Sequence, residues 1–485
     1  MKKFYITTSI AYTNAPPHIG FALESIQADV LARYHRNLKE DVFFLTGTDE
    51  HGAKIVKAAE AAGKTPKEFV DGVVLRFKGL KQVLNLSNDG FIRTTDQAAH
   101  WPSVQKVWLK LKDKGDIYKK NYQGLYCSGC EAFITKKDLV QGKCAIHLKE
   151  PELINEENYF FKLSRYADKI KDLIEKDKLK IVPEARKNEM LSFINQGLED
   201  VSFSRPRKDL KWGIPVPGDD SQTIYVWADA LTNYISAIGY EKENKVFKKF
   251  WPADIHCVGK DILKFHALIW PGMLLSLGLD LPKSIFVHGF ITVDGQKMSK
   301  SLGNVIDPFE LAEKYGRDPV RYYLLREIPS SEDGDFSYEK FEKRYNSELA
   351  SGIGNLVSRV RVMAEKAGFK EKKSKAVNLE IERTSKNYSS SIKSLKFNEA
   401  LKAVWELIGF CDKHIEKNRP WEEKEDSSEV LGSLLVVLDN IAGLLKPFLP
   451  ETAEKIEKEI ERDKKSGRFK NKREGSLFPK ISPKP

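Results

Sequence analysis

Residues 4–34 read FYITTSIAYTNAPPHIGFALESIQADVLARY, and this stretch decides the fold. Its first part, 4–10, is rich in aromatic and β-branched residues, which favour a β-strand. The Pro-Pro pair at 16–17 then predicts a turn, because two prolines cannot continue a strand. Over 19–34 the apolar residues recur at the spacing of an α-helix. The stretch therefore predicts a strand that passes through a tight turn into a helix.

His18 and Gly20 lie at the start of this predicted helix. A helix N-terminus carries free N–H groups and the positive end of the helix dipole, which suits a phosphate group. Gly20 would let a nucleotide approach the backbone, since glycine has no side chain. The alternative is a histidine that only caps the helix.

Further strands alternate with helical patterns along the chain. Strands are predicted at 41–46, 91–94 and 284–290, and the last of these is expected to be the final strand before a lysine-containing loop. The segment 225–234 is expected to resume the sheet and then enter a helix. Strands that alternate with helices indicate a parallel sheet, whose ligands bind beyond the carboxyl ends of the strands. Asp49 follows one such end and is a candidate ligand contact, although it could also cap the next helix.

Composition limits the class of protein. A chain of 485 residues is expected to form two to four domains. The net charge of +11 favours a polyanionic partner. The longest apolar stretch, 265–279, is too short to span a membrane and is interrupted by Pro271, so we expect it in a buried core. No apolar segment typical of a signal peptide follows the N-terminus, and a cytoplasmic location is predicted.

Two pairs of metal-ligating residues predict a zinc site. Cys127 and Cys130 form the first pair, Cys144 and His147 form the second, and thirteen residues separate the pairs. Tetrahedral Zn²⁺ takes four nitrogen or sulfur ligands, and pairs at this spacing form knuckles. One structural Zn²⁺ per chain is expected, because four protein ligands leave no open position for catalysis. Three of the five cysteines lie in this cluster, which argues against a disulfide scaffold.

The pattern becomes helical almost throughout after residue 345. A mostly helical region is also predicted to begin at 158. Long helices are predicted at 346–366, 379–393, 396–416 and 428–445, and they indicate a separate helix bundle. The predicted fold is α/β: a Rossmann-type parallel sheet split by a zinc-knuckle insertion and followed by an all-α helix-bundle domain. The predicted boundaries are 1–118 and 223–295 for the two halves of the sheet domain, 119–222 for the insertion, 296–344 for a linker region and 345–485 for the bundle with its C-terminal extension.

The lysine-containing loop carries a known signature. Residues 295–303 read GQKMSKSLG, which contains the KMSKS signature letter for letter. Residues 18–21, HIGF, are similar to its partner signature, HIGH. Either segment alone could be an ordinary surface feature, but the pair in this order resembles class I aminoacyl-tRNA synthetases. Phe21 departs from the pattern, since the family usually has a second histidine there.

The resemblance extends over essentially the whole chain to the methionyl-tRNA synthetase family. It implies ATP-dependent ligation of L-methionine to tRNA(Met) through a methionyl-adenylate, with Mg²⁺ accompanying ATP. It also implies catalytic roles for His18, Lys297 and Lys300, and ATP binding by these residues together with Gly20 and Ser299. The alternatives are another class I nucleotidyl transferase or synthetase, and a catalytically inactive tRNA-binding paralogue that Phe21 would favour.

The same resemblance assigns residues to two further sites. In this family, methionine is bound by residues that match Ile10, Tyr12, Asp49, Trp227, Tyr234, Ile262 and His266. A thioether is unbranched and polarizable, so aromatic and aliphatic walls suit it. The anticodon is read by residues that match Asn355, Arg359 and Trp421. Trp421 could instead only hold two helices of the bundle together. The chain is expected to close with a short segment that docks on the body, without an appended tRNA-binding domain, which favours a monomer.

Overall fold

The computed structural model describes residues 2–129, 131–134, 139–145, 148–299, 302–369, 374–422, 427–461, 469 and 475–482. Two compact units divide the chain. Unit 1 comprises Met1–Pro17, His35–Gln82 and Ser87–His288, and unit 2 comprises His18–Tyr34, Val83–Leu86 and Gly289–Pro485. The boundary after Pro17 separates the first strand from the start of the first helix.

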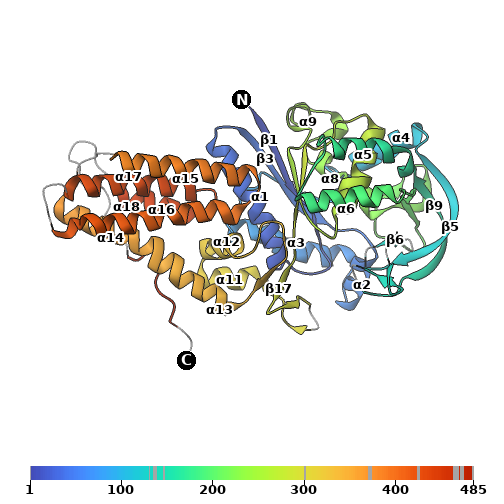
Figure 1. Ribbon diagram of the computed structural model, residues 1–485. Helices are drawn as coiled ribbons and strands as arrows, with labels where there is room; N and C mark the ends of the chain where they lie inside the picture. Colours follow the sequence, from blue (N-terminus) through green and yellow to red (C-terminus); the bar gives the residue numbers. More distant parts are fainter. Residues whose placement is uncertain are drawn as a thin grey trace. The chain divides into compact units, whose positions relative to one another are not determined.

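A parallel sheet forms the centre of unit 1 (Figure 1). Among the described residues it has seven strands in the order β10-β16-β15-β1-β3-β2, with β4 also paired to β3. The strands are β1 (Lys3–Thr8), β2 (Ala11–Tyr12), β3 (Asp41–Asp49), β4 (Gly90–Arg93), β10 (Lys180–Val182), β15 (Ile255–Gly259) and β16 (Ser284–His288). All of their pairings are parallel. The predicted parallel sheet is therefore confirmed.

The region after 150 differs from the prediction. The prediction of a mostly helical region from 158 is wrong for its first residues. They belong to β9 (Glu152–Phe161), a long strand that pairs antiparallel with β5 (Ile117–Cys127). Glu156, Asn158 and Phe160 are buried at every second position, which is the period of a strand. The short strands β6 (Ala132–Ile134) and β11 (Val201–Ser202) extend this antiparallel sheet. Helices begin only later, at α5 (Ala167–Glu175) and α6 (Glu184–Asn195).

Two strands lie elsewhere than the sequence patterns predict. Between α5 and α6 the chain returns to the parallel sheet, where Ile181 of β10 pairs with Ile285 of β16. The segment 119–222 thus supplies an edge strand of the main sheet. The expectation that 225–234 resumes this sheet is wrong. The preceding strand, β14 (Asp219–Ile224), pairs antiparallel with β12 (Ser204–Pro206) and β13 (Pro215–Val216), and α7 (Val226–Leu231) follows at once.

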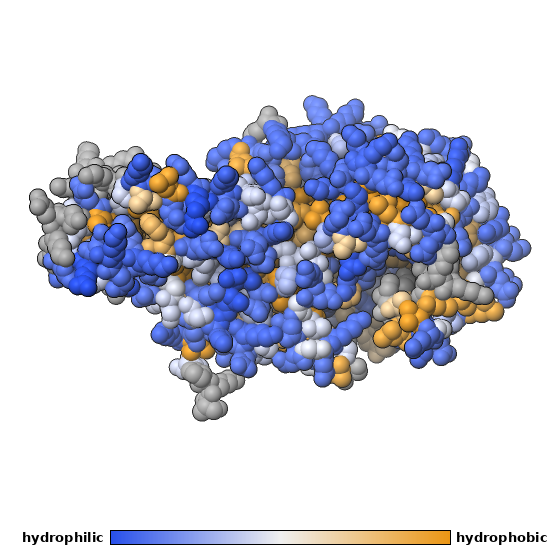
Figure 2. Space-filling view, in the orientation of Figure 1, coloured by the Kyte–Doolittle hydropathy of each residue, from blue (hydrophilic) through white to orange (hydrophobic). Residues whose placement is uncertain are grey.

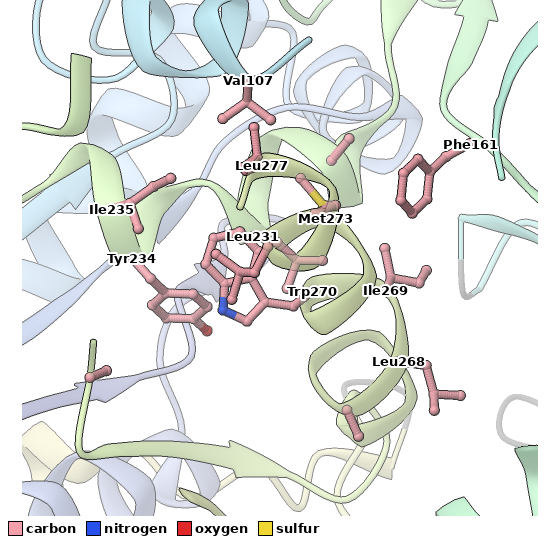
Figure 3. Packing of buried hydrophobic residues seen from close by; sticks show 14 of the residues in the cluster. Val107, Phe161, Leu231, Tyr234, Ile235, Leu268, Ile269, Trp270, Met273 and Leu277 are labelled. Carbon is pink, nitrogen blue, oxygen red and sulfur yellow. The ribbon is translucent and has the colours of Figure 1, made fainter. Parts of the chain in front are cut away.

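The apolar stretch 265–279 is buried in the core of unit 1, as predicted. It forms a π-helical turn, η4 (Phe265–Ile269), which continues into α10 (Trp270–Leu277). Figure 3 shows Trp270 and Met273 of α10 packed among Tyr234, Leu231 and other apolar side chains. The remaining helices of the unit are α2 (Ala53–Ala61), α3 (Pro66–Val83), α4 (Trp101–Asp113), α8 (Asn233–Ser236) and α9 (Lys245–Phe250).

Unit 2 is mostly helical. It contains most of α1 (Ile19–Asn37), then α11 (Pro308–Tyr315), α12 (Arg317–Arg326), α13 (Tyr338–Arg344), η6 (Tyr345–Gly354), α14 (Asn355–Ala367), α15 (Lys375–Lys393), α16 (Phe397–Asn418), α17 (Ser427–Leu445) and α18 (Pro450–Ile460). The four long helices predicted after 345 are confirmed, and η6 is a π-helical start to the first of them. The strand at 284–290 is not the last before the lysine-containing loop, because β17 (Ile291–Val293) follows it, and β18 (Gln296–Lys297) lies within the loop itself. They form a small sheet with β19 (Gly334–Phe336).

A fully buried arginine joins the parts of unit 2. Arg321 of α12 donates to the carbonyls of Leu84, Pro447 and Phe448, and its guanidinium lies 2.7 Å from the carboxylate of Asp29 in α1. Each of the three guanidinium nitrogens therefore has an acceptor, as a buried charge requires. The helix that begins beside His18 is thereby tied to the α17–α18 turn of the bundle.

The C-terminal segment docks on unit 2, as predicted. Asn346 and Ile481 exchange two hydrogen bonds, each 2.9 Å long. Phe478 is buried and packs against Tyr345, with ring centroids 6.0 Å apart.

Apolar surface is limited on the face that Figure 2 shows, where hydrophilic residues predominate. Among the described helices, α17 is long and apolar enough to cross a membrane by length and composition, and 61% of that window is buried. Such a helix is also typical of a bundle core.

Candidate active site

The two signature segments meet within unit 2. The backbone N–H of Ile19 donates to the carbonyl of Ile306 at 3.1 Å, just beyond the lysine-containing loop. Met298 of that loop also lies above Gly20, because a Cβ placed at Gly20 would be 3.9 Å from the Met298 methyl carbon. Residues separated by about 280 positions in the chain are thus brought together.

A hydrogen bond to His18 determines which of its ring nitrogens carries the proton. Its Nδ1 accepts a hydrogen bond from the backbone N–H of Gly20 at 3.0 Å, so in the neutral ring Nε2 carries the proton. Desolvation lowers the pKa of His18, which favours this neutral form. The expectation of free N–H groups at this helix start needs correction, since the N–H groups of Ile19 and Gly20 are both used within the protein. An anion here would meet the Nε2–H group and the helix dipole instead.

Asn304 holds the lysine-containing loop from both sides. Its side-chain oxygen accepts from the Ser299 N–H at 2.9 Å, and its amide nitrogen donates to the Lys297 carbonyl at 3.2 Å. The Lys297 side chain is exposed. Lys300 lies outside the described residues, so its predicted role stays a prediction.

Unit 1 brings together the residues predicted to bind methionine, beginning with a buried hydrogen-bond chain. The Tyr234 hydroxyl and His266 Nε2 are 2.7 Å apart, and His266 Nδ1 lies 2.9 Å from the Ile262 carbonyl. Because a carbonyl only accepts, Nδ1 carries the proton and Nε2 accepts from the tyrosine. Burial lowers the pKa of His266 to about 4, so the ring is neutral near pH 7.

An aromatic wall adjoins this chain. Trp227 stacks on Phe265 with ring centroids 3.7 Å apart and planes 5° from parallel, and it meets His266 edge to face at 6.3 Å. Ile10 packs close to Gly47, since a Cβ at Gly47 would be 3.0 Å from the Ile10 methyl group. These surfaces can enclose an apolar, polarizable side chain.

Asp49 and Tyr12 contribute polar groups beside this wall. They are register partners in neighbouring strands, β3 and β2. Burial raises the pKa of Asp49 well above its usual range, and the nearby carboxylates Asp229 and Glu131 raise it further. No cationic side chain forms an ion pair with Asp49 among the described residues. The Tyr12 hydroxyl is likewise buried without a hydrogen-bond partner in that part of the chain. Both groups therefore suit a bound ligand that carries a donor, such as an ammonium group.

A buried network behind Asp49 was missed by the sequence reasoning. The Asp229 carboxylate lies 2.7 Å from His51 Nδ1 and 2.7 Å from His100 Nε2, and His100 Nδ1 lies 2.7 Å from the Ser236 hydroxyl. His51 stands two residues after Asp49, so the network fixes the turn that follows this residue. The available signal was the polar run TGTDEHG at 46–52, which is unusual at the end of a buried strand.

Gly52 is required in the same turn. Its φ of +116° favours glycine, and a Cβ there would lie 2.4 Å from the Tyr12 hydroxyl. Trp212 closes the turn from the other side, since its indole N–H donates to the Glu50 carbonyl at 2.6 Å.

The predicted zinc ligands are only partly described. Cys127 and Cys144 are both 2% exposed and pack into one small cluster with Ile134. Cys130 and His147 lie outside the described residues. Within the residues that are described, no group of three or more candidate metal ligands occurs. Two buried thiols in one cluster fit a zinc site, since thiolates are its preferred ligands.

The predicted anticodon residues lie on the helical unit. Asn355 begins α14 and is exposed, and Arg359 follows one turn later with its side chain 34% exposed. Arg359 donates to Glu416 at 2.9 Å. Trp421 lies in the short helix η7 (Pro420–Glu422), which contacts α14, and it is 43% exposed. A tryptophan that only held helices together would be buried, so its exposure favours the recognition hypothesis.

Comparison with known proteins agrees with this geometry. Residues 4–145 and 130–361 match the family described as tRNA synthetases class I (M), and residues 375–480 match the anticodon-binding domain of tRNA ligase. The parallel sheet and the paired signatures thus define a class I aminoacyl-tRNA synthetase.

Similarity to individual proteins shows which family of class I aminoacyl-tRNA synthetases this chain resembles. The methionine–tRNA ligase of Clostridium acetobutylicum is 47% identical over 95% of this chain and 73% of its own length, and that of Brucella suis is 40% identical over 94% and 91%. A solved structure of the Mycobacterium tuberculosis methionyl-tRNA synthetase in complex with methionyl-adenylate superimposes with a TM-score of 0.89 at 38% identity, covering 94% of this chain and 93% of that one. The chain belongs to the methionyl-tRNA synthetase family.

Proposed function

We propose that this chain ligates L-methionine to tRNA(Met) at the expense of ATP, through a methionyl-adenylate. The observation that carries the proposal is the contact between the two signature segments, in which Ile19 bonds to Ile306 and Met298 covers Gly20. In this arrangement His18 and Lys297 belong to one compact unit. Family membership supplies the substrates.

In the first step the methionine carboxylate attacks the α-phosphorus of ATP, a P–O bond forms, and pyrophosphate leaves with the electrons of the broken bond. The carboxylate is already ionised near pH 7, so no general base is needed. His18 would donate from Nε2–H to a phosphate oxygen, and its neutral form suits donation without a proton transfer. Lys297 and Lys300 would neutralise the negative charge that develops on the phosphates. Gly20 and Ser299 would complete the ATP site.

Methionine would be selected by a pocket in unit 1 that has apolar walls and a few polar side-chain groups. Its thioether would pack against Trp227, Ile10 and Ile262, which are half-buried around the site. Its ammonium group would pair with Asp49 and meet the hydroxyl of Tyr12. Tyr234 and His266, whose hydroxyl oxygen and Nε2 lie 2.7 Å apart, would form the polar end of the pocket.

In the second step a ribose hydroxyl of the terminal tRNA adenosine attacks the adenylate carbonyl, an ester bond forms, and AMP leaves. The hydroxyl proton departs with the released AMP or passes to solvent. Asn355, Arg359 and Trp421 would read the anticodon by polar contacts and base stacking. The predicted domain roles follow: catalysis by 1–118 and 223–295, connection by 119–222, linkage by 296–344 and anticodon binding by 345–485, in the cytoplasm.

Two metal ions belong to the proposal. Mg²⁺ bound with ATP would neutralise part of the phosphate charge. Structural Zn²⁺ would be held by Cys127, Cys130, Cys144 and His147, where the two described thiols are already buried together. It would stabilise the end of the insertion.

ATP–pyrophosphate exchange, measured with each of the twenty amino acids, tests the function. We expect exchange with methionine and little with any other amino acid. Exchange with another amino acid would indicate a different synthetase. Absence of exchange, with tRNA binding retained, would indicate an inactive tRNA-binding paralogue.

A further inference from the structure

Unit 1 contains a cavity of about 360 Å³ that no step above uses. It lies between the antiparallel sheet of β5, β6, β9 and β11, the loop after α6, and the turn η4. Its walls include seven aromatic rings: Tyr122, Tyr126, Phe133, Phe160, Phe193, Tyr225 and Phe265. The volume falls within the range of small-ligand sites, and the aromatic content suits a flat group.

Three of the cavity's rings are partly exposed, although two of them, Phe193 and Phe265, also pack against the core of unit 1. Phe133, Phe193 and Phe265 are each only half-buried, whereas Phe160 and Leu268 at the floor are 1% exposed. A single exposed apolar side chain is ordinary in a folded protein, but several partly exposed rings around one cavity indicate a ligand site. The exposed parts of these rings therefore favour an aromatic ligand within the cavity.

Cationic groups accompany these rings. Lys264 Nζ lies 3.6 Å from the centroid of the Phe193 ring, Lys120 Nζ lies 4.5 Å from that of Phe160, and the Arg205 guanidinium lies 4.3 Å from that of Tyr126. The charge of Arg205 is neutralised by a bidentate ion pair with Glu156. Lysines and arginines beside aromatic rings are typical of sites for single-stranded nucleic acid. A lipid or an apolar peptide would not require the cations.

Acceptor groups line the same cavity. The side chains of Gln196, Asp200 and Asp261 belong to its wall. Asp200 already accepts from Tyr118 and Ser164, whereas Asp261 is exposed. A carboxylate repels phosphate but accepts from an exocyclic amino group, which adenine carries on its base-pairing edge. The polar wall thus favours the base of a nucleotide over its phosphate.

The cavity adjoins the methionine site through a single aromatic ring. Phe265 forms part of the cavity wall and stacks on Trp227, which is proposed to line the methionine pocket. A ribose hydroxyl that attacks the adenylate carbonyl must lie beside that pocket, and its base must lie within one sugar of it. We propose that the cavity seats the base of the 3′-terminal adenosine of tRNA, stacked on Phe193. The proposal rests on the proposed function.

Phe193→Leu is the variant that tests this seat, because leucine keeps the apolar volume and removes the flat face. Phe91→Leu is the matched control: Phe91 of β4 is also half-buried with a lysine over its ring, Lys78 at 5.5 Å, but it lies outside the cavity. Transfer from preformed methionyl-adenylate would be followed in a single turnover. In parallel, the affinity of each protein for intact tRNA(Met) and for tRNA(Met) without its terminal adenosine would be measured.

We expect Phe193→Leu to slow transfer by about 5- to 150-fold, the range for loss of one stacked base, with methionine-dependent exchange unchanged. Removal of the terminal adenosine should weaken binding to the parent protein and to Phe91→Leu, but not further to Phe193→Leu, because partners in contact are not additive. Normal transfer in Phe193→Leu would overturn the proposal. So would an equal penalty for adenosine removal in all three proteins.

A photoreactive 8-azidoadenosine at the tRNA 3′ end gives a second test that needs no variant. Crosslinks should map to the peptides that carry Phe193 or Phe265, and crosslinks confined to other peptides would contradict the assignment. Failure of the proposed function is separately visible, since the parent protein would then not catalyse exchange with methionine.

Discussion

Tyr234 donates its hydroxyl hydrogen to Nε2 of His266 over 2.7 Å, and this bond fixes the protonation of a buried imidazole. The opposite ring nitrogen donates to the Ile262 carbonyl. A second proton on the ring would remove the acceptor that the tyrosine needs and would place an unpaired charge in the core. Burial disfavours the charged ring and lowers the pKa of His266 to about 4.

Stability should therefore decrease at acid pH. The unfolded chain takes up a proton on His266 near pH 6.5, whereas the folded chain does so only near pH 4, so the unfolded state binds more protons between these values. The free energy of unfolding should fall by on the order of 3 kcal/mol as the pH drops through this window. Urea unfolding at several pH values measures it. His266→Gln should show a shallower pH dependence, and identical slopes in the two proteins would contradict the assignment.

Gly20→Ala should impair ATP activation. The added Cβ would lie 2.8 Å from Cε1 of His18, so the imidazole must leave its position. A misplacement of about 1 Å typically costs 10²-fold in rate. Pre-steady-state adenylate formation should fall by about that factor, with methionine affinity little changed. Gly72→Ala in α3, where a Cβ meets no atom within 4 Å, is the control and should form adenylate normally.

Asp49→Asn should weaken methionine binding without reducing the stability of the protein. Loss of the charge that pairs with the methionine ammonium should raise the KM for methionine by about 10- to 150-fold, the range for a charged hydrogen bond. The KM for ATP should change much less. The variant should be as stable as the parent or more so, because the neutral amide removes a buried carboxylate from the neighbourhood of Asp229 and Glu131. An unchanged KM for methionine would remove Asp49 from the site.

Purified protein should contain one zinc per chain. The double variant Cys127→Ser, Cys144→Ser should lose the metal and unfold at a lower temperature, because structural zinc contributes to folding. Cys257→Ser changes an equally buried thiol in β15 and should retain the metal. Elemental analysis and thermal unfolding of the three proteins provide the comparison. A zinc-free parent protein of normal stability would exclude the site.

Trp421→Ala should affect only the step that uses tRNA. Loss of one stacked base is worth roughly 1–3 kcal/mol, or about 5- to 150-fold in aminoacylation efficiency. Because Trp421 is 43% exposed, its removal should cost far less stability than the 3–5 kcal/mol of a buried tryptophan. Aminoacylation, exchange and thermal unfolding on one preparation distinguish the outcomes. Joint loss of both activities through unfolding would favour a role in holding the bundle together.

The sequence predicted those helices and strands that carry a clear signal in their own residues. The helices α14 to α17 follow helical patterns, and the strand β1 follows a composition rich in aromatic and β-branched residues; these elements appear where those signals place them. The start of β9 and the placement of β10 were not foreseen, because each depends on a partner elsewhere in the chain. Ile181, for example, pairs with Ile285 across more than 100 residues.

In the candidate site, too, local signatures were predictable and contacts between distant residues were not. Short signatures located His18 and Lys297, since their residue types and spacing carry the chemistry. The link from His51 to Asp229 spans 178 residues and consists of single side chains, so no local pattern records it. The shared ring of Phe265, which joins the methionine pocket and the cavity, was likewise visible only in three dimensions.

The order of strands in the parallel sheet also constrains how the chain can fold on the ribosome. β1, within the first eight residues, pairs with β15 at Ile255–Gly259, and β15 pairs with β16 at Ser284–His288. At translation speeds of about 5–20 residues per second, the N-terminal strand must wait roughly 15–60 s for these partners to emerge. During that interval β1 can pair only with β3, and its other edge is open to foreign strands. Nascent chains should therefore engage a chaperone until β16 has left the exit tunnel.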